Sequence, residues 1–196
     1  MEMAPDLDAC RRGDRLALEA VFREQAPAIG ALLARLVGAS ADLEDLRQNT
    51  FVAAIRAFPR FRGDASVKTW LARIAINVVH EYLRNPERRR HTPLELLDAG
   101  DEAALGAPPD RIAAGRRAMA RFYRHLDALR PKKRICFVLH VIEGRSFEEV
   151  AALVGVPRFT VRSRVAFARR ELLAAAQEDP VLRELSGTAG KNGGTR

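Results

Sequence analysis

The residues best suited to chemistry are the arginines on the second helix of a predicted helix-turn-helix. Ser146 and Glu149 have the spacing of a capping box, which starts a helix. Gly155 permits a sharp turn, and Pro157 pre-sets the backbone for the next helix. That second helix presents donors suited to phosphates and guanine edges: Arg158, Arg162, Ser163, Arg169 and Arg170. The pattern predicts a helix that reads duplex DNA, although a helical hairpin with a basic surface would look similar.

A second polar face lies on the predicted helix 67–84. Arg73, Asn77, His80 and Arg84 recur at intervals of four, three and four residues, so they share one side of the helix. Trp70 lies beside them, with Ile74 and Val78. Such a face can follow a nucleic-acid backbone and bond an unstacked base. A solvated charged face has the same pattern, so the helix alone leaves both interpretations open.

The segment 42–51 carries the third candidate surface. Asp42, Glu44 and Asp45 favour a helix start through the helix dipole, and Asp42 is a candidate cap. Arg47, Gln48 and Asn49 add hydrogen-bonding groups. These residues predict a polar docking face, and a capped, solvated helix explains them equally well.

Charge supports a polyanionic partner. The net charge is +8 and the isoelectric point about 10.4. Residues 42–90 carry +4, 91–115 carry −4 and 116–185 carry +7, so two basic blocks flank an acidic spacer. An arginine-rich proteome would explain the total but not this alternation. No apolar run approaches the roughly 18 residues of a membrane span, and no signal peptide is present, so we expect a cytoplasmic protein without membrane insertion.

Catalysis, metal binding and cofactors find no support in the sequence. Cys136 and His140 have a spacing that can bind zinc, but two further ligands are missing nearby, and the apolar surroundings favour a buried thiol. Glu148 and Glu149 stand at a helix start, where carboxylates favour the dipole. There is no phosphate loop and no nucleophile motif. We therefore expect no enzyme, no metal site and no cofactor, and Cys10 with Cys136 makes no disulfide framework.

The elements that position these residues are all predicted to be helices, because no period-two pattern appears. One amphipathic run begins at Leu16, and a separate helix is expected through Ala28–Val37 after Pro27. Ser66 is the expected cap of helix 67–84. The predicted organisation is all-α with two small helical domains joined by a flexible acidic linker, and its parts are a domain at 10–90, a linker at 91–115, a domain at 116–183 and a disordered tail at 184–196.

Taken together, the three segments resemble the sigma-70 family of promoter-recognition factors, in particular its extracytoplasmic-function group. The N-terminal resemblance rests on Asp42-Leu-Glu44-Asp45-Leu-Arg-Gln48-Asn-Thr-Phe51, Phe61-Arg-Gly63-Asp64-Ala65-Ser66 and Thr69-Trp70-Leu71-Ala-Arg73-Ile74-Ala75-Ile-Asn77. The C-terminal resemblance rests on Gly144-Arg-Ser146-Phe-Glu148-Glu149-Val150-Ala151 and Val156-Pro157-Arg-Phe-Thr160-Val161-Arg162-Ser163-Arg164. It covers nearly the whole chain except the tail.

The resemblance implies partners and roles. Core RNA polymerase, promoter DNA and an anti-sigma factor are the expected partners. The β′ clamp helices would contact a first set of residues, namely Asp42, Glu44, Asp45 and Gln48. The −10 element would be opened and read by a second set, Phe61, Trp70, Arg73, Asn77 and Arg84. A third set would read the −35 element: Arg158, Thr160, Arg162, Ser163 and Arg169. The same C-terminal helix-turn-helix would also contact the β flap.

Some positions depart from the family pattern, and two other functions stay open. Phe159 stands where many members carry glycine, and Phe167 where many carry arginine. Trp70-Leu71 replaces the paired tryptophans of primary factors, which predicts weaker melting and stricter promoter choice. The alternatives are a one-component helix-turn-helix regulator, which needs no base-capturing face at 61–84, and a sigma-like decoy that only sequesters an inhibitor.

Overall fold

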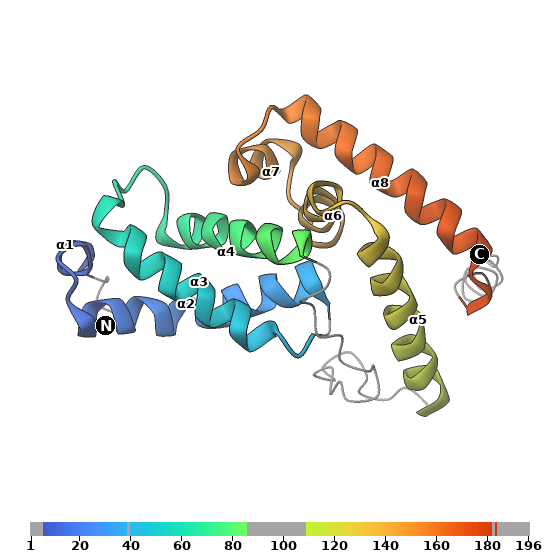
Figure 1. Cartoon of the computed structure of the whole chain (residues 1–196), viewed down its shortest axis with the longest axis horizontal. Coiled ribbons are helices and arrows are strands. Elements are labelled where there is room, and N and C mark those ends of the chain that lie inside the picture. Colours follow the sequence, from blue (N-terminus) through green and yellow to red (C-terminus); the bar gives the residue numbers. More distant parts are fainter. Residues whose placement is uncertain (1–5, 39, 86–108, 182, 184–196) are drawn as a thin grey trace, which may run out of the picture.

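The computed structural model describes residues 6–38, 40–85, 109–181 and 183. Within these ranges every element is a helix and no strand forms, which confirms the all-α prediction. The N-terminal helices are α1 (Leu7–Arg11), α2 (Arg15–Val37), α3 (Leu43–Ala57), the 3-10 turn η1 (Phe58–Arg60) and α4 (Val67–Arg84). The C-terminal helices are α5 (Pro109–Ala128), α6 (Pro131–Phe137), the π-helical turn η4 (Val138–Ile142), α7 (Phe147–Val154) and α8 (Arg158–Glu178). Figure 1 shows the two groups side by side.

Side-chain caps start two helices where the sequence predicts them. The Ser66 hydroxyl accepts the Thr69 backbone N–H at 3.2 Å, which caps α4. At α7 the capping box is complete, because Ser146 accepts from the Glu149 N–H while the Glu149 carboxylate accepts from the Ser146 N–H at 2.7 Å. Asp42 stands at the predicted N-cap position of α3, but its side chain makes no capping hydrogen bond. Its carboxylate instead accepts a hydrogen bond from the Tyr82 hydroxyl of α4 at 3.0 Å.

The prediction of a helix break at Pro27 is also wrong. A single helix, α2, runs through Pro27, and the proline ring is exposed. A proline inside a helix costs about 3 kcal/mol. Both halves of α2 nevertheless bury apolar side chains, with Val21 on one side of the proline and Leu33 on the other. Burial along the whole helix therefore outweighs the local cost, which a rule based on one residue does not anticipate.

The predicted linker is helical at its C-terminal end. Helix α5 begins at Pro109 and continues through Gly115, so residues 109–115 extend the second helical group. Pro109 suits this place, since a proline in the first turn of a helix removes no hydrogen bond there. The remainder of the predicted linker up to residue 108, and the predicted tail 184–196, lie outside the described residues.

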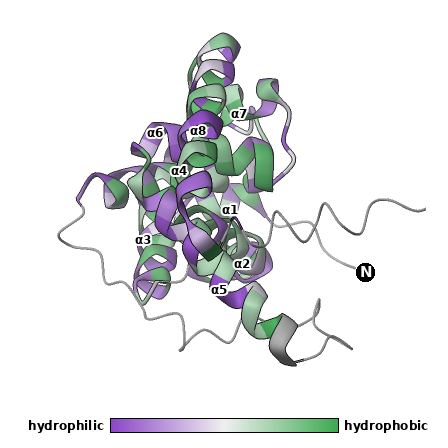
Figure 2. Ribbon diagram, turned by 90° about the vertical axis from the view of Figure 1, so that its right-hand side faces the viewer, coloured by the Kyte–Doolittle hydropathy of each residue, from purple (hydrophilic) through white to green (hydrophobic). Residues whose placement is uncertain are grey.

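Hydrophilic and hydrophobic residues mix along the helices in Figure 2, and the buried apolar side chains form two clusters. An aromatic cluster joins the first helices to the loop before α4; it consists of Cys10, Leu18, Val21, Phe58 and Phe61, with Trp70 packed at its edge. A second cluster is continuous from the helices α2–α4 to the helices α5–α8. The two groups of helices therefore share one apolar core, although the sequence predicts two separate domains.

Polar contacts reinforce this shared core. Arg134 of α6 is 1% exposed, and its Nε donates to the Leu36 carbonyl oxygen of α2 at 2.7 Å. A second Arg134 nitrogen pairs with the Asp127 carboxylate. The end of α2 also lies close to α5, because a Cβ at Gly38 would be only 2.5 Å from the Tyr123 ring. The arginine thus connects the two halves of the chain through the backbone of α2.

Candidate nucleic-acid interface

Helices α7 and α8 form the predicted helix-turn-helix. Gly155 closes α7 in the left-handed region, with φ +67°, and its N–H donates to the Ala151 carbonyl at 2.9 Å. Pro157 then stands at the N-cap of α8. Val150 of α7 and Val161 of α8 are both fully buried between the two helices. The turn is therefore fixed by a glycine and a proline, and the pair of helices holds the outer side of α8 in one orientation.

The outer side of α8 carries most of the predicted −35 residues. The exposed ones are Arg158, Arg162, Ser163 and Arg169, whereas Thr160 is half-buried. Arg158 is already paired, since its Nε lies 2.8 Å from a Glu148 oxygen on α7. Arg164 turns away from this side and places a guanidinium nitrogen 3.9 Å from the Cys136 sulfur. The structure thus brings together three exposed donors that have no acidic partner among the described residues: Arg162, Ser163 and Arg169.

The predicted −10 residues do not share one open surface. Asn77 and Arg84 are exposed on α4, and Arg84 pairs with Glu81 at 3.3 Å. Arg73 is half-buried, and its Nε finds no hydrogen-bond partner among the described residues. Trp70 is half-buried and packs edge-on against the Phe58 ring, with centroids 5.0 Å apart.

Phe61 is buried, whereas the family resemblance implies that it contacts the −10 element. Its side chain is 6% exposed. Its ring centroid lies 5.0 Å from that of Trp70 and 5.5 Å from that of Phe58. Arg11 of α1 covers it from outside and donates from Nε to the Phe61 carbonyl at 2.9 Å. The physical reason is that burying an aromatic ring in an existing cluster is more favourable than exposing it to water. The ring is therefore not available for stacking on a base in this conformation.

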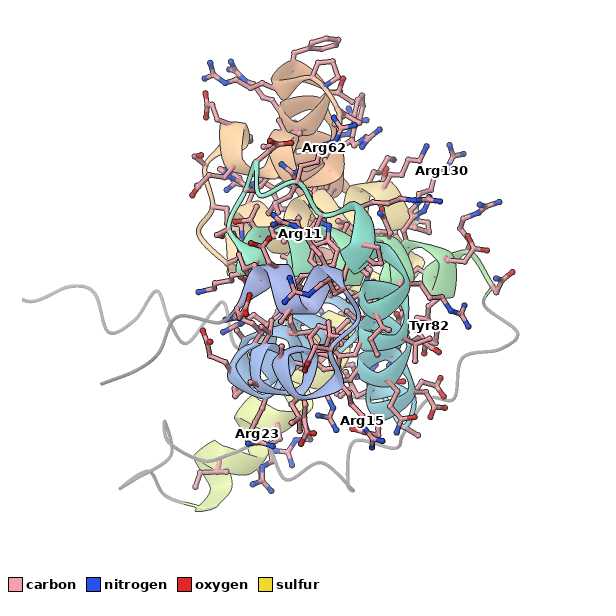
Figure 3. The ribbon with its side chains drawn as sticks, turned by 90° about the vertical axis from the view of Figure 1, so that its left-hand side faces the viewer. Arg11, Arg15, Arg23, Arg62, Tyr82 and Arg130 are labelled. Atoms are coloured by element: carbon pink, nitrogen blue, oxygen red, sulfur yellow. The ribbon has the colours of Figure 1, made fainter. Side chains whose placement is uncertain are left out.

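Beyond Asn77, the α4 face adjoins a basic cleft that the sequence did not predict. The cleft has a volume of about 630 Å³, and cationic or titratable side chains line it from both halves of the chain: His80, Arg84, Arg130, Lys132, Lys133 and Arg164. Arg130 projects outward (Figure 3). Burial lowers the pKa of His80, and the nearby Lys132 and Arg84 lower it further. The only sequence signal for this cleft is the basic run at residues 130–134.

A smaller hollow of about 220 Å³ lies beside it and is lined by both halves of the chain. Asn77 and His80 form one wall, and Cys136 and Arg164 form part of the other. The exposed amide of Asn77 therefore faces the C-terminal helices. His140, which the sequence spacing placed near Cys136, instead has its Nδ1 2.7 Å from the Arg145 carbonyl and its ring stacked 4.0 Å from Phe147.

Three of the four predicted polymerase-binding residues lie on the open side of α3. Glu44 accepts hydrogen bonds from Arg47 at 2.7 Å and from Gln48 at 3.1 Å, and the bond from Arg47 is the main cause of its lowered pKa. Asp45 is exposed. Asp42 is the exception, because it is 5% exposed and bonded to Tyr82. Asp42 therefore joins α3 to α4 inside the protein.

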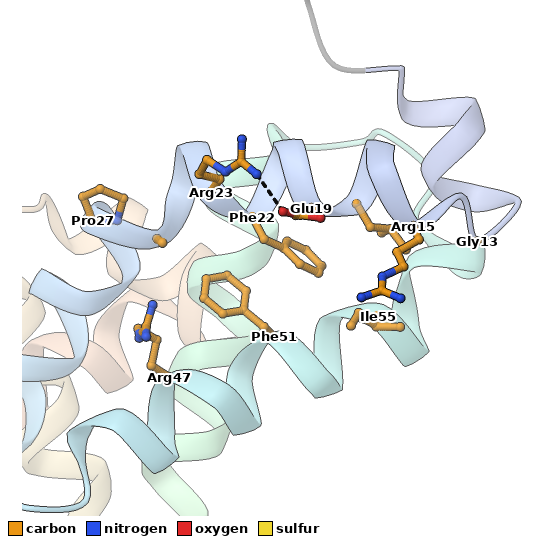
Figure 4. Close-up of a pocket in the computed structure, with 11 residues that line it drawn as sticks. Gly13, Arg15, Glu19, Phe22, Arg23, Pro27, Arg47, Phe51 and Ile55 are labelled. Atoms are coloured by element: carbon orange, nitrogen blue, oxygen red, sulfur yellow. Dashed lines mark hydrogen bonds and ion pairs between the residues drawn. The ribbon is translucent and has the colours of Figure 1, made fainter.

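A groove of about 970 Å³ lies between α2 and α3 near this face (Figure 4). Phe22 and Phe51 form its apolar floor, with ring centroids 5.0 Å apart. Arginines stand around it, and Arg23 is paired with Glu19 at 2.6 Å. Sequence patterns could not reveal the groove, because its two walls come from different helices.

Comparison with known proteins decides the family. Residues 21–90 match sigma-70 region 2, and residues 119–172 match sigma-70 region 4. The sigma-E factor of Escherichia coli, an extracytoplasmic-function factor, is 30% identical over 85% of this chain and 90% of its own length. The sigma-H factor of Pseudomonas aeruginosa is 32% identical over 91% of this chain and 94% of its own length. The chain belongs to the sigma-70 family.

The sigma factor also resembles solved structures of this class. It matches CnrH, solved with the cytosolic domain of CnrY, with a TM-score of 0.60 at 26% identity over 88% of this chain and 96% of the other. The RpoE factor of Bartonella quintana, solved with the anti-sigma factor NepR, matches with a TM-score of 0.56 at 24% identity over 82% and 97%. This second likeness supports the fold alone.

Membership confirms the predicted class of function. The sigma factor is a non-enzymatic transcription initiation factor of the extracytoplasmic-function type, as its matched regions and relatives show. Region 2 corresponds to α2–α4, and region 4 corresponds to α5–α8. Among the described residues, no helix combines the length and apolar character that a membrane span requires.

Proposed function

We propose that the sigma factor binds core RNA polymerase through the open side of α3 and reads promoter DNA with two separate helices. Region 4 would insert the outer side of α8 into the −35 major groove. Region 2 would open the −10 element and hold an unstacked base against α4. The observation that carries this proposal is the outer side of α8, where Arg162, Ser163 and Arg169 stand exposed on a helix held by a helix-turn-helix.

Within region 2 we assign base capture to Asn77. Its amide is exposed on α4, and an amide can both donate to and accept from the edge of a base. Trp70 and Arg73 lie toward the start of the same helix, and Arg84 at its end could contact a phosphate. Phe61 would need to leave the aromatic cluster before it could stack on a base.

For the polymerase contact we assign Glu44, Asp45 and Gln48 on α3 to the β′ clamp helices. These side chains stand on one exposed side near the helix start. The β flap is the proposed partner of region 4. Asp42 is left out of this set because its carboxylate is buried against Tyr82.

Promoter binding also requires regions 2 and 4 to separate. The −10 and −35 elements are roughly 25 base pairs apart, which is about 85 Å at 3.4 Å per base pair. In the arrangement that the structure shows, which we call closed, region 4 packs on α4 and lines the hollow beside Asn77. We therefore propose that the sigma factor opens on the polymerase, and that an anti-sigma factor holds it closed.

The anti-sigma proposal rests on the similar structure of CnrH, which was solved with the cytosolic domain of CnrY bound. Purification of the tagged factor from its native cells, under conditions where its transcripts are absent, is expected to recover a second protein in equal amount. Recovery of only free factor or polymerase would argue against such an inhibitor.

Asn77→Ala is expected to slow promoter opening about tenfold, because one amide–base contact contributes about 1–3 kcal/mol. Binding of region 4 to a duplex −35 element should be unchanged, since Asn77 lies on α4. Stopped-flow fluorescence of a labelled −10 element measures the opening rate with holoenzyme.

A template with a mismatched bubble at −10 serves as the control. The bubble removes the cost of strand separation, so it should restore part of the rate but not the −10 base preference. Normal opening of duplex promoters by Asn77→Ala, with an unaltered −10 preference, would show that α4 does not capture a base through this residue.

A further inference from the structure

Phe159 is the most exposed aromatic side chain among the described residues. It is the second residue of α8, directly after Arg158, and 73% of its surface is exposed. Exposing a phenylalanine ring to water is unfavourable, because a ring of this size is stabilised when it is removed from water. Its place on the helix is therefore more informative than its exposure alone.

That place is on the outer side of α8, in its first turn. Arg162 and Ser163 follow Phe159 by three and four residues, so both side chains are its neighbours on the helix surface. Val161 and Val165 are buried on the opposite side. In a helix-turn-helix, the first turns of the second helix reach the base edges. Phe159 thus lies among the donors that would read the −35 element.

The second phenylalanine of this helix is different. Phe167 is 44% exposed, and two cations cover its ring, with the Arg170 guanidinium at 4.9 Å and the Lys133 ammonium at 5.5 Å from the ring centroid. Phe159 has no ring or cation contact of this kind among the described residues. Only Phe159 therefore presents an uncovered apolar surface in the first turns of α8.

The major groove offers one apolar group to such a surface. Guanine, adenine and cytosine present hydrogen-bonding atoms there, whereas thymine adds a 5-methyl group. A phenyl ring placed against a polar base edge would leave that edge without a hydrogen bond, which is unfavourable. Contact with a methyl group carries no such cost.

We propose that Phe159 packs against the 5-methyl group of a thymine and so selects thymine at one position of the −35 element. This inference rests on the proposed reading of the −35 element by α8. It adds a specificity determinant to the hydrogen-bonding side chains, Arg162 and Ser163, that lie beside it.

Replacing thymine by deoxyuridine tests this contact, because the change removes the methyl group and leaves base pairing intact. The holoenzyme binds a promoter duplex in which each −35 thymine is replaced in turn, and the dissociation constant is measured for each. The expected result is a loss of affinity of about fourfold at one thymine, since burying one methyl group contributes about 0.8 kcal/mol, and little change at the others.

Variants connect that loss to Phe159. With Phe159→Ala, the thymine-to-deoxyuridine difference should disappear, whereas Phe159→Leu should keep part of it. Phe167→Ala removes a ring from the same helix and should leave the difference unchanged. Both phenylalanines are exposed, so folding is expected to survive, and circular dichroism checks this.

The outcomes separate the contact from the wider function. If the holoenzyme binds the −35 element specifically but no deoxyuridine substitution weakens it, the Phe159 contact is wrong and the reading of −35 by α8 stands. If Phe159→Ala keeps the thymine preference but weakens binding to core polymerase, the ring serves a protein partner and the proposal fails. Absence of any specific −35 binding would overturn the proposed function itself.

Discussion

Arg134→Ala is expected to lower the free energy of unfolding by about 3 kcal/mol. The side chain is 1% exposed and donates to the Leu36 carbonyl across the two regions. Removing one partner of a buried, hydrogen-bonded ion pair costs about 3–5 kcal/mol, and partial exposure of Asp127 places this case at the lower end. Urea unfolding followed by circular dichroism measures the change.

A control variant lies on the same helix. Lys133 pairs with Glu171 at 2.5 Å, but both side chains are partly exposed, so Lys133→Ala should cost less than about 1 kcal/mol. Small-angle scattering should in addition show a larger radius of gyration for Arg134→Ala, because the contact between regions 2 and 4 is weakened. If Arg134→Ala unfolds like the natural protein and stays as compact, Arg134 does not hold the regions together.

Asp45→Arg is expected to weaken binding to core RNA polymerase about tenfold or more. Asp45 is exposed on α3 beside Glu44 and Gln48, and a reversed charge at an interface adds repulsion to the lost attraction. Fluorescence anisotropy of the labelled factor with core polymerase, at two salt concentrations, measures the dissociation constant. The loss should shrink at high salt, since exposed charges are screened.

Glu178→Arg makes the same change of charge at the end of α8 and serves as the matched control. It should leave core binding close to that of the natural protein. Asp45→Arg should also leave the binding of region 4 to a duplex −35 element unchanged, because Asp45 lies in region 2. Unchanged affinity of Asp45→Arg for core polymerase would mean that another face of the sigma factor makes this contact.

The helix-turn-helix could be predicted because its signals are local. A capping box, a turn glycine and a proline act over a few residues, and the structure reproduces each of them at Ser146, Gly155 and Pro157. The exposed donors of α8 follow from helix periodicity alone. Where neighbouring residues decide the conformation, a single sequence is sufficient to predict it.

The burial of Phe61 and the packing between regions could not be predicted in this way. Phe61 carries a family motif, but its ring packs with Phe58 and Trp70 in a cluster that Leu18 and Val21 of α2 complete, and Arg11 of α1 covers it from 50 positions earlier in the sequence. Arg134 is one of three consecutive cations, and it reaches a carbonyl 98 positions earlier. Nothing local distinguishes it from Lys132 and Lys133. Pro27 shows the same limit, because packing along α2 outweighs the local cost of a proline.

Transcription with purified core RNA polymerase on fragments of the host genome tests the central claim most directly. The claim is that this chain directs initiation by reading two promoter elements with α4 and α8. We expect new transcripts only when the sigma factor is present, and their start sites should share −10 and −35 sequences at a constant spacing. Core polymerase that neither binds the factor nor gains specific transcripts would contradict the claim.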